Sequence, residues 1–337
     1  MHSKPSKGTL PGSMRAIRLQ RPGGELRIEN LPLPGPGPGQ VLVKIGAAPI
    51  NPSDLAILKG NTPVHRIPWT PGLEGSGTVV KAGRGLIPAL RKGKRVACTP
   101  DPGGDGTWAE YMVTSAMRCS PLPSDVTLEQ GSMMLVNPMT ALAFMDIARK
   151  EKHRAVVNNA AAGALGKMLL GLSRKYRLPL ICIVRKQEHA DELVQLGAEY
   201  VLNSSSEHFR EELQRLAHEL DATLFLDAVT GRQTSLLLEA APKGSRLIAY
   251  ARLSGENISV DPAWLIREDK QLSGFYLANW LRTKNLLSKI RILNRAGGML
   301  NRTLASKIRQ TMPLEQAEEA VSLYTTGMSA GKIILVP

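Results

Sequence analysis

The 337-residue chain contains few aromatic residues, few cysteines and no long apolar run. Phe, Trp and Tyr together make up 4% of it, too few for the alternating basic and stacking side chains of a single-strand nucleic-acid binder. The three cysteines, Cys98, Cys119 and Cys182, are scattered and odd in number, so no disulfide framework is expected and a reducing compartment is favoured. No apolar run approaches the roughly 20 residues that cross a bilayer. These absences predict a cytoplasmic protein with no membrane partner and no nucleic-acid partner.

The first residues also lack the apolar core of a signal peptide, and we expect residues 1–13 to form a flexible tail. The composition is globular, with 43% hydrophobic and 21% charged residues, and the length allows two domains. The formal net charge is +14, and the lysines and arginines are spread along the chain. This charge fits either an anionic partner, such as a phosphate-bearing cofactor or a nucleic acid, or a general basic bias.

Between residues 14 and 123, short runs with β-strand character alternate with Gly and Pro, as at 41–45, 77–80 and 95–98. The segment Leu33–Gly39, in which Pro and Gly alternate, cannot form a helix or a central strand and is expected on the surface. Closely spaced strands of this kind are typical of a compact, barrel-like β domain.

Between residues 130 and 280, strands and helices alternate, which predicts a parallel sheet with helices on both faces. After this zone we expect a helix over 286–300, a second helix that begins at Pro313, and a closing strand over 331–336. The strands expected in the alternating zone are 155–159, 180–185, 200–203, 223–228, 246–251 and 272–277, and the helices are 163–176, 188–196, 207–220 and 233–241.

A run of small residues, 160–166, joins the first of these strands to the first helix. Small residues at such a turn let the backbone approach a diphosphate, which the free N–H groups and the positive dipole end of the helix then hold. An A-x-x-G-x-x-G pattern alone is weak, because Ala/Gly-rich turns also arise from plain helix–strand packing. The residues assigned to cofactor binding are Ala161, Ala162, Gly163, Ala164, Leu165 and Gly166.

The next strand ends at Arg185, followed by Lys186, where an NAD-binding fold carries Asp or Glu. An acidic side chain accepts hydrogen bonds from the ribose 2′-OH, whereas a guanidinium suits a 2′-phosphate. The sequence therefore predicts NADPH rather than NADH, unless Arg185 is only a solvated charge at a strand end. Asp227 ends the fourth strand and is assigned to the same site, although its carboxylate can instead cap the following helix.

Four motifs precede this turn: N-P-S-D at 51–54, P-G-L-E-G-S-G at 71–77, G-T-W-A-E-Y at 106–111 and V-N-P-M-T-A at 136–141. In this order they resemble the medium-chain dehydrogenase/reductase superfamily, and the resemblance runs from about residue 14 to the C-terminus. It implies an α/β fold with a Rossmann doubly wound parallel sheet plus a GroES-like β-barrel catalytic domain. The Rossmann domain would cover 131–282, and the catalytic domain 14–130 and 283–337.

Alcohol dehydrogenases of that superfamily use a catalytic zinc and often a four-cysteine zinc lobe, which need three and four protein ligands. Three cysteines cannot build the lobe. The resemblance places a zinc-ligating Cys where this chain has Asn51 and a His where it has Leu73, and His65 with Glu74 makes a poor zinc site. We therefore predict no metal.

Without zinc, the chain resembles the quinone oxidoreductases and the 2-enoyl thioester reductases, the latter through Gly60-Asn61 and through L-I-R-E-D…G-F at 265–275. The thioester reductases carry Tyr directly after the Gly-Asn pair, whereas this chain has Thr62, whose hydroxyl is a weaker acid than a phenol. The leading hypothesis is an NADPH-dependent oxidoreductase that transfers hydride to a quinone or an α,β-unsaturated carbonyl. The alternatives are an enoyl-CoA or enoyl-ACP reductase and, in another class, a non-catalytic, crystallin-like protein that binds NADPH or RNA.

Conjugate reduction needs the nicotinamide and the substrate held in contact, and the product can take its proton from water. We assign Asn51, Thr62 and Thr140 to the catalytic site, with His65 as another polar candidate at its mouth. Asn51 can instead be a turn-forming residue before a proline, and Thr62 and His65 can lie in an exposed loop.

The family's terminal G-K-[IV]-[IV]-L strand adds Lys332 as a cofactor contact. Tyr250 and Phe275, in the last two strands of the alternating zone, complete the set of cofactor-binding residues with Lys186. The resemblance also implies a homodimer joined edge to edge near residues 272–280.

Overall fold

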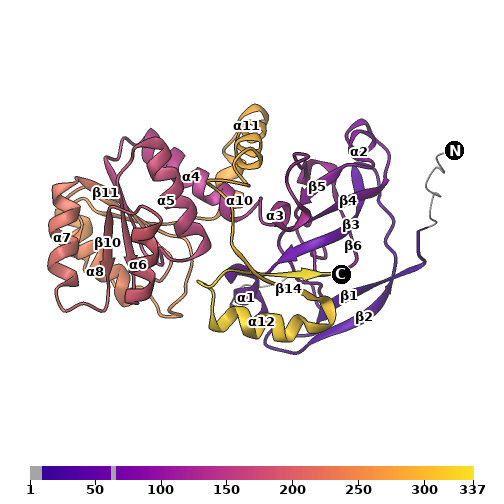
Figure 1. Ribbon diagram of the computed structural model, residues 1–337, viewed down its shortest axis with the longest axis horizontal. Coiled ribbons are helices and arrows are strands. Elements are labelled where there is room, and N and C mark those ends of the chain that lie inside the picture. The colour runs from indigo at the N-terminus through magenta and orange to yellow at the C-terminus, as the bar shows by residue number, and fades with distance from the viewer. Residues whose placement is uncertain (1–9, 62–65) are drawn as a thin grey trace.

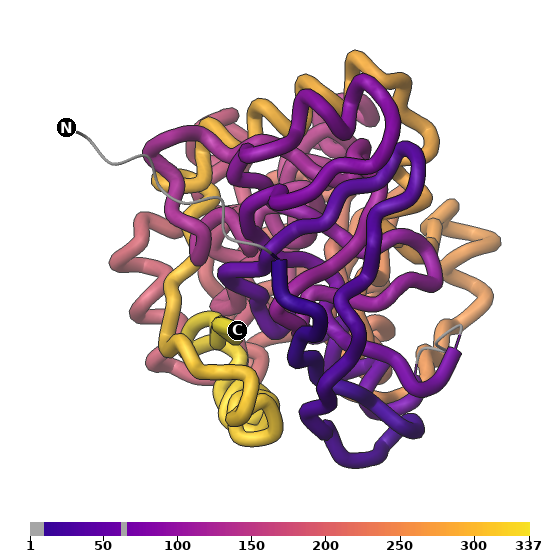
Figure 2. The backbone as a smooth tube through the Cα atoms, turned by 90° about the vertical axis from the view of Figure 1, so that its right-hand side faces the viewer, coloured from indigo at the N-terminus to yellow at the C-terminus, as the bar shows by residue number. Residues whose placement is uncertain are grey.

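The computed structural model describes residues 10–61 and 66–337, which form two large sheets with helices around them (Figure 1). The six-stranded sheet lies on the left of Figure 1 and the seven-stranded sheet on the right. The strands β1 (Ser13–Leu19) and β2 (Leu26–Pro32) form a separate antiparallel pair. The second view shows the N-terminal β strands in front of the helices that follow them (Figure 2).

The six-stranded sheet is parallel and runs in the order β10, β9, β8, β11, β12, β13. Counted from β8, this is the order 3-2-1-4-5-6 of the Rossmann fold, and the direction of winding reverses between β8 and β11. The predicted doubly wound sheet is confirmed, with every strand and helix end within three residues of its expected position. The strands are β8 (Ala155–Asn158), β9 (Leu180–Val184), β10 (Tyr200–Asn203), β11 (Ala222–Asp227), β12 (Arg246–Ala249) and β13 (Gln271–Gly274).

Alternate residues of each parallel strand point to opposite faces, so each face has its own apolar cluster. Val156 and Cys182 face one layer of helices, whereas Val157 and Ile183 face the other. The first layer contains α4 (Asn137–Lys150), α5 (Ala164–Tyr176), α6 (Gln187–Gln195) and α11 (Leu286–Gly297). The second contains α7 (Phe209–Glu219), α8 (Arg232–Ala240) and α9 (Pro262–Arg267), and α10 (Leu277–Arg282) precedes α11.

The seven-stranded sheet combines the N-terminal part of the chain with its C-terminal end. Its order is β14, β15, β3, β4, β5, β7, and β6 also pairs with β3. Its strands are β3 (Gln40–Pro49), β4 (Gly75–Ala82), β5 (Arg95–Cys98), β6 (Tyr111–Ser115), β7 (Cys119–Pro121), β14 (Ile308–Pro313) and β15 (Lys332–Val336), and the helices of this part are α1 (Pro52–Leu58), α2 (Leu86–Arg91), α3 (Leu128–Ser132) and α12 (Ala317–Thr326).

The expected helix start at Pro313 is wrong. Pro313 is the last residue of β14, where it lies opposite Val336 of the parallel strand β15. A 3-10 turn, Leu314–Gln316, follows, and α12 begins only at Ala317. The apolar spacing after Pro313 is helical, but the strand partner lies 23 positions further on and leaves no local signal. The segment Leu33–Gly39 is a surface connection, as expected. No helix in the described ranges is long and apolar enough to cross a membrane.

Candidate active site and cofactor cleft

The run Ala160–Gly166 forms the turn between β8 and α5. Ala160 has a φ of 50°, which turns the chain sharply, and Gly163 is the N-cap of α5. A Cβ on Gly166 would lie 2.2 Å from the Ala161 carbonyl oxygen, so only glycine allows this close approach. Within the described chain, the N–H groups of Ala164, Leu165 and Gly166 donate to no protein acceptor. The turn therefore has the free donors that a diphosphate needs.

Asn159 and Asp227 connect the ends of β8 and β11, where the winding of the sheet reverses. Asn159 Nδ2 donates to Asp227 Oδ1 at 2.6 Å, and Asn159 Oδ1 accepts from Ala228 N at 2.7 Å. Asp227 also accepts hydrogen bonds from Thr230 N at 2.8 Å and from Thr234 Oγ1 at 2.6 Å. The buried carboxylate thus organises the loop before α8 from within the protein, and its assignment as a direct cofactor contact stays a prediction.

Arg185 follows β9 and is exposed. No hydrogen bond or ion pair to its guanidinium occurs within residues 10–61 and 66–337, whereas Lys186 Nζ lies 3.1 Å from Glu188. The Ser205 hydroxyl, at the end of the neighbouring strand, donates to the Arg185 carbonyl oxygen at 2.9 Å. The guanidinium is therefore free to pair with an anion beside a serine that our sequence reasoning did not single out.

In the part of the molecule that contains the seven-stranded sheet, Asn51 is the centre of a buried polar network. Asn51 precedes α1, is 1% exposed, and its Nδ2 donates to Glu74 Oε1 at 3.1 Å. Its Oδ1 accepts a hydrogen bond from Lys332 Nζ, which also donates to the Ile50 carbonyl oxygen at 3.2 Å. The ammonium of Lys332 lies 5.5 Å from the ring centre of Tyr324. Asn51 is thus more than a turn-forming residue.

Glu74 extends this network to the start of α4. Its Oε2 accepts hydrogen bonds from Leu135 N at 2.9 Å and Val136 N at 3.0 Å. Thr140, in the first turn of α4, donates its hydroxyl to the Val136 carbonyl oxygen at 2.8 Å. A continuous hydrogen-bonded chain therefore connects Lys332 to Thr140. It links three of the residues assigned from the sequence through a glutamate that was not assigned.

The charges of this network are buried, and burial sets their protonation. Desolvation raises the pKa of Asp54 to about 7, although the N–H group of Asn51 and the ammonium of Lys332 act in the opposite direction. Desolvation also raises the pKa of Glu74, against the effect of Lys332 and the Asn51 amide. For both carboxyl groups, the loss of hydration outweighs the stabilisation that Lys332 and the nearby N–H groups give to the charged form.

Tyr250 and Phe275 lie just beyond β12 and β13, where both contact Phe144 of α4. Their rings are centred 5.2 Å and 4.7 Å from the Phe144 ring. The Tyr250 hydroxyl donates to Asn158 Oδ1 at 3.1 Å, and burial raises the pKa of this phenol. The cluster closes the carboxyl-end edge of the sheet with an apolar wall.

Thr62 and His65 lie outside the described residues, so their assignments stay predictions. Of the residues that our sequence reasoning missed, Glu74 had a signal, because it is the acidic residue of the P-G-L-E-G-S-G motif. Phe144 and Asn159 had no such signal, since nothing in the sequence shows which distant residues they contact.

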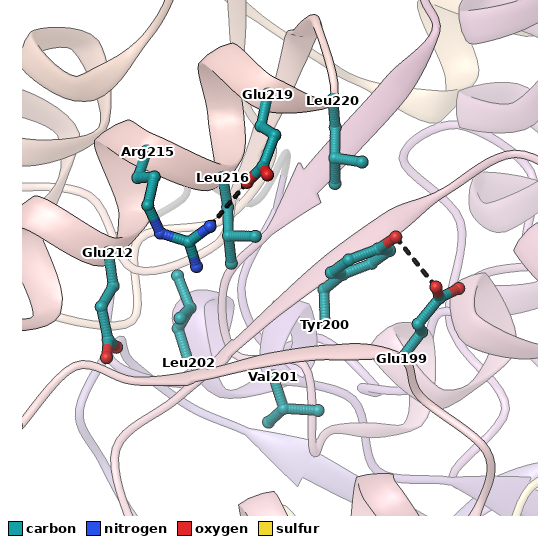
Figure 3. A pocket seen from close by; sticks show the side chains of 9 residues that line it. All are labelled: Glu199, Tyr200, Val201, Leu202, Glu212, Arg215, Leu216, Glu219 and Leu220. Carbon is teal, nitrogen blue, oxygen red and sulfur yellow. Dashed lines mark hydrogen bonds and ion pairs between the residues drawn. The ribbon is translucent and has the colours of Figure 1, made fainter.

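A pocket of about 540 Å³ lies elsewhere, between β10 and α7 (Figure 3). Its polar side chains pair with each other, as Tyr200 does with Glu199 and Arg215 with Glu219. None of the assigned site residues lines it. It is therefore not the candidate active site.

The chain matches two known families. The alcohol dehydrogenase GroES-like domain matches residues 37–124, and the zinc-binding dehydrogenase family matches residues 164–291. The mitochondrial enoyl-[acyl-carrier-protein] reductase of Homo sapiens is 30% identical over 285 residues, which cover 82% of this chain and 75% of that protein.

Solved structures agree with these matches. A Mesorhizobium loti protein described as a candidate NADPH:quinone reductase is 34% identical, with a TM-score of 0.90 and coverage of 98% of this chain and 100% of that chain. A mycobacterial protein complexed with NADPH shares the fold at a TM-score of 0.80 and 24% identity, covering 96% of this chain and 100% of that chain.

A Rossmann sheet, a GroES-like domain and a polar network between them define a two-domain oxidoreductase. The chain belongs to the medium-chain dehydrogenase/reductase superfamily, in the branch of the quinone oxidoreductases and enoyl reductases.

The residues present do not fit the zinc site of other members. Position 51 carries an amide that is bonded to Lys332 and Glu74, and both Glu74 oxygens already accept hydrogen bonds. In the part of the chain that the structure describes, no group of three or more His, Cys, Asp or Glu residues could hold a metal ion. A zinc-free site stays our prediction, and elemental analysis of the purified protein tests it.

Proposed function

We propose that this oxidoreductase transfers hydride from NADPH to a quinone or an α,β-unsaturated carbonyl compound without zinc. The observation that carries the proposal is the hydrogen-bonded chain from Lys332 through Asn51 and Glu74 to the start of α4. It places an amide that is bonded to an ammonium at position 51, where the resemblance puts a zinc-ligating cysteine in other members.

Different residues are proposed to bind the cofactor and to orient the reacting groups. The N–H groups of Ala164–Gly166 would hold the diphosphate, and Arg185 would hold the 2′-phosphate that distinguishes NADPH from NADH. When bound, NADPH supplies the hydride. Asn51 and Thr140 orient nicotinamide and substrate, and Lys332 positions Asn51. The reduced product can take its proton from water, because holding the hydride donor and the acceptor in contact supplies much of the rate without an acid side chain.

Enoyl thioester reduction is the second candidate, because the human relative with that activity in its name is 30% identical to this chain. Against it stands Thr62, where the thioester reductases carry a tyrosine. A positive charge of +14 suits the phosphates of coenzyme A or of a carrier protein. Both candidates share the same cofactor and differ in the acceptor.

Two further parts of the proposal concern the molecule as a whole. We propose a homodimer joined along β13, because this strand is one edge of the parallel sheet and its open backbone groups can pair with a second copy. We also propose a cytoplasmic location, on the basis of the three free cysteines.

The test is a screen of NADPH oxidation over quinones, enals, enones and crotonyl thioester, with NADH as the control cofactor. Turnover of quinones or enones supports the leading proposal, and a preference for crotonyl thioester selects the second. Salt-dependent RNA binding without turnover of any acceptor would instead favour a non-catalytic, crystallin-like protein.

A further inference from the structure

The acidic residues of this chain, unlike the basic ones, are unevenly distributed. From Lys270 to Leu314 the sequence contains nine lysines and arginines and no aspartate or glutamate. This acid-free segment includes β13, α10 and α11. In Figure 1, α11 stands at the top of the molecule between the two sheets, and in Figure 2 it again lies at the periphery. Lys270 is buried and paired with Glu268, so the surface charge of this segment comes from the basic residues after β13, among them the exposed Arg282 and Arg291.

The outward side of α11 is apolar in its first half. Leu286, Leu287 and Ile290 are 55%, 66% and 45% exposed, and helical spacing places them on one side. The inward side carries Ile292 and Ala296, which are buried in the cluster formed with α4 and α5. The helix is therefore apolar on both sides, and the described chain covers only the inward one. We call Leu286, Leu287 and Ile290 the outer face of α11.

Basic residues surround the outer face. Lys289 and Arg291 lie beside it on α11, and Lys284, which precedes the helix, lies 4.5 Å from the ring centre of Trp280. Burial and the neighbouring Lys150 of α4 lower the pKa of Lys284, as expected where cations gather.

The acidic residue on this side is Asp146 of α4, which accepts a hydrogen bond from Arg295 at 3.2 Å. Arg295 also donates to the Tyr176 hydroxyl, and Arg149 lies 5.4 Å from the Tyr176 ring centre. Asp146 is therefore already paired with a cation and does not neutralise Lys284, Lys289 or Arg291 by a direct ion pair.

We propose that the outer face of α11 docks on an anionic lipid bilayer. Leucine and isoleucine between lysines and arginines are the pattern of helices that lie in a membrane interface, where the aliphatic side chains enter the headgroup boundary and the cations meet anionic lipids. A nucleic acid would gain nothing from three exposed aliphatic side chains. This inference departs from the expectation of no membrane partner, which depended on the lack of a spanning segment. An interfacial helix needs no such segment.

The experiment is vesicle flotation of the full chain at low and high salt. The probes are vesicles of phosphatidylcholine with 30 mol% phosphatidylserine and vesicles of pure phosphatidylcholine. We expect the protein to float with the anionic vesicles at low salt and to be released at high salt. In Leu286→Gln/Leu287→Gln/Ile290→Gln, the partition coefficient should fall by about tenfold or more. In Lys289→Gln/Arg291→Gln it should fall about 25-fold, from about fivefold for each charge removed.

Matched controls change the same residue types where the outer face has no counterpart. Val194→Gln/Leu196→Gln alters exposed aliphatic side chains beside the acidic residues of α6, and Lys152→Gln/Arg154→Gln alters exposed cations between α4 and β8; both variants should float as the unaltered protein does. Thermal unfolding of every variant shows that the fold is kept.

Five results would overturn the proposal. The protein could stay unbound to anionic vesicles at low salt, or bind both vesicle types equally. Its binding could survive the change of the outer face. Binding to polyglutamate but not to vesicles would assign the surface to an acidic protein. A halved mass in light scattering of the Leu286→Gln/Leu287→Gln/Ile290→Gln variant would assign it to a second copy of this chain.

Discussion

Replacing Glu74 with glutamine tests the hydrogen-bonded chain that joins the two parts of the molecule. The carboxylate accepts three hydrogen bonds, from Asn51 Nδ2 and from the N–H groups of Leu135 and Val136, at 2.9 to 3.1 Å. A glutamine keeps one acceptor oxygen and turns an NH₂ group toward at least one of these donors. A hydrogen bond to a charged group contributes about 1.5–3 kcal/mol, and the buried Lys332 also loses a neighbouring negative charge. Removing the buried charge, whose desolvation raises the pKa of Glu74, offsets part of this loss, so we expect Glu74→Gln to lower the free energy of unfolding by about 1–3 kcal/mol.

The same change should affect turnover more than cofactor affinity. The start of α4 carries Thr140, and a displacement of about 1 Å at reacting groups can reduce the rate on the order of 100-fold. We expect kcat on the best acceptor of the screen to fall roughly 10- to 100-fold. The KM for NADPH should change less than about threefold, because Arg185 and the Ala160–Gly166 turn lie in the other part of the molecule.

Urea unfolding and steady-state NADPH oxidation measure the two effects. The control is Glu110→Gln, since Glu110 accepts hydrogen bonds from Arg15 at 2.8 and 2.9 Å outside the candidate site. The control should lose some stability and keep its turnover. A Glu74→Gln variant that is less stable but turns over within twofold of the unaltered enzyme would refute a positioning role for Glu74. Unchanged stability would refute the argument from buried hydrogen bonds itself.

Three further changes test other parts of the molecule. Arg185→Ala should weaken NADPH binding by roughly 1.5–3 kcal/mol and leave NADH binding nearly unchanged; an equal loss for both cofactors would remove the phosphate assignment. Gly166→Ala should cost roughly 1–3 kcal/mol of stability, because its Cβ would lie 2.2 Å from a backbone oxygen, whereas Gly35→Ala, with open space around it, should be neutral. Asp54→Asn tests how the burial of this carboxyl makes stability depend on pH. Folding raises the pKa of Asp54 from 3.8 to about 7, so the folded state becomes less stable as pH rises from about 4 to about 7. Relative to the unaltered protein, Asp54→Asn should therefore gain up to about 4 kcal/mol between pH 4 and pH 8, measured by urea unfolding, and an equal difference at both pH values would contradict the assigned burial effect.

Much of the parallel half of this fold could be predicted, because its signals are local. Each strand is a short apolar run, each helix has apolar residues at helical spacing, and the small residues at 160–166 mark the first turn. The helix expected at Pro313 failed for the opposite reason. Its residues have a helical pattern, but β15 supplies a strand partner to Pro313 from 23 positions away, and pairing overrides local preference.

The sequence by itself determined the turn and the arginine after the second parallel strand, since both depend only on which residues stand at which spacing; the prediction of a zinc-free site needed the resemblance to a family as well. Tertiary structure alone decided that Asn51, Glu74 and Lys332 meet in one buried network, because their separations along the chain are 23 and 281 positions. It also decided that the apolar side chains at the start of α11 face outward, since burial depends on what packs against a helix and not on its own pattern. The polar network of the site therefore depends on tertiary packing, which buries residues that are distant in the sequence and lets them form hydrogen bonds with one another.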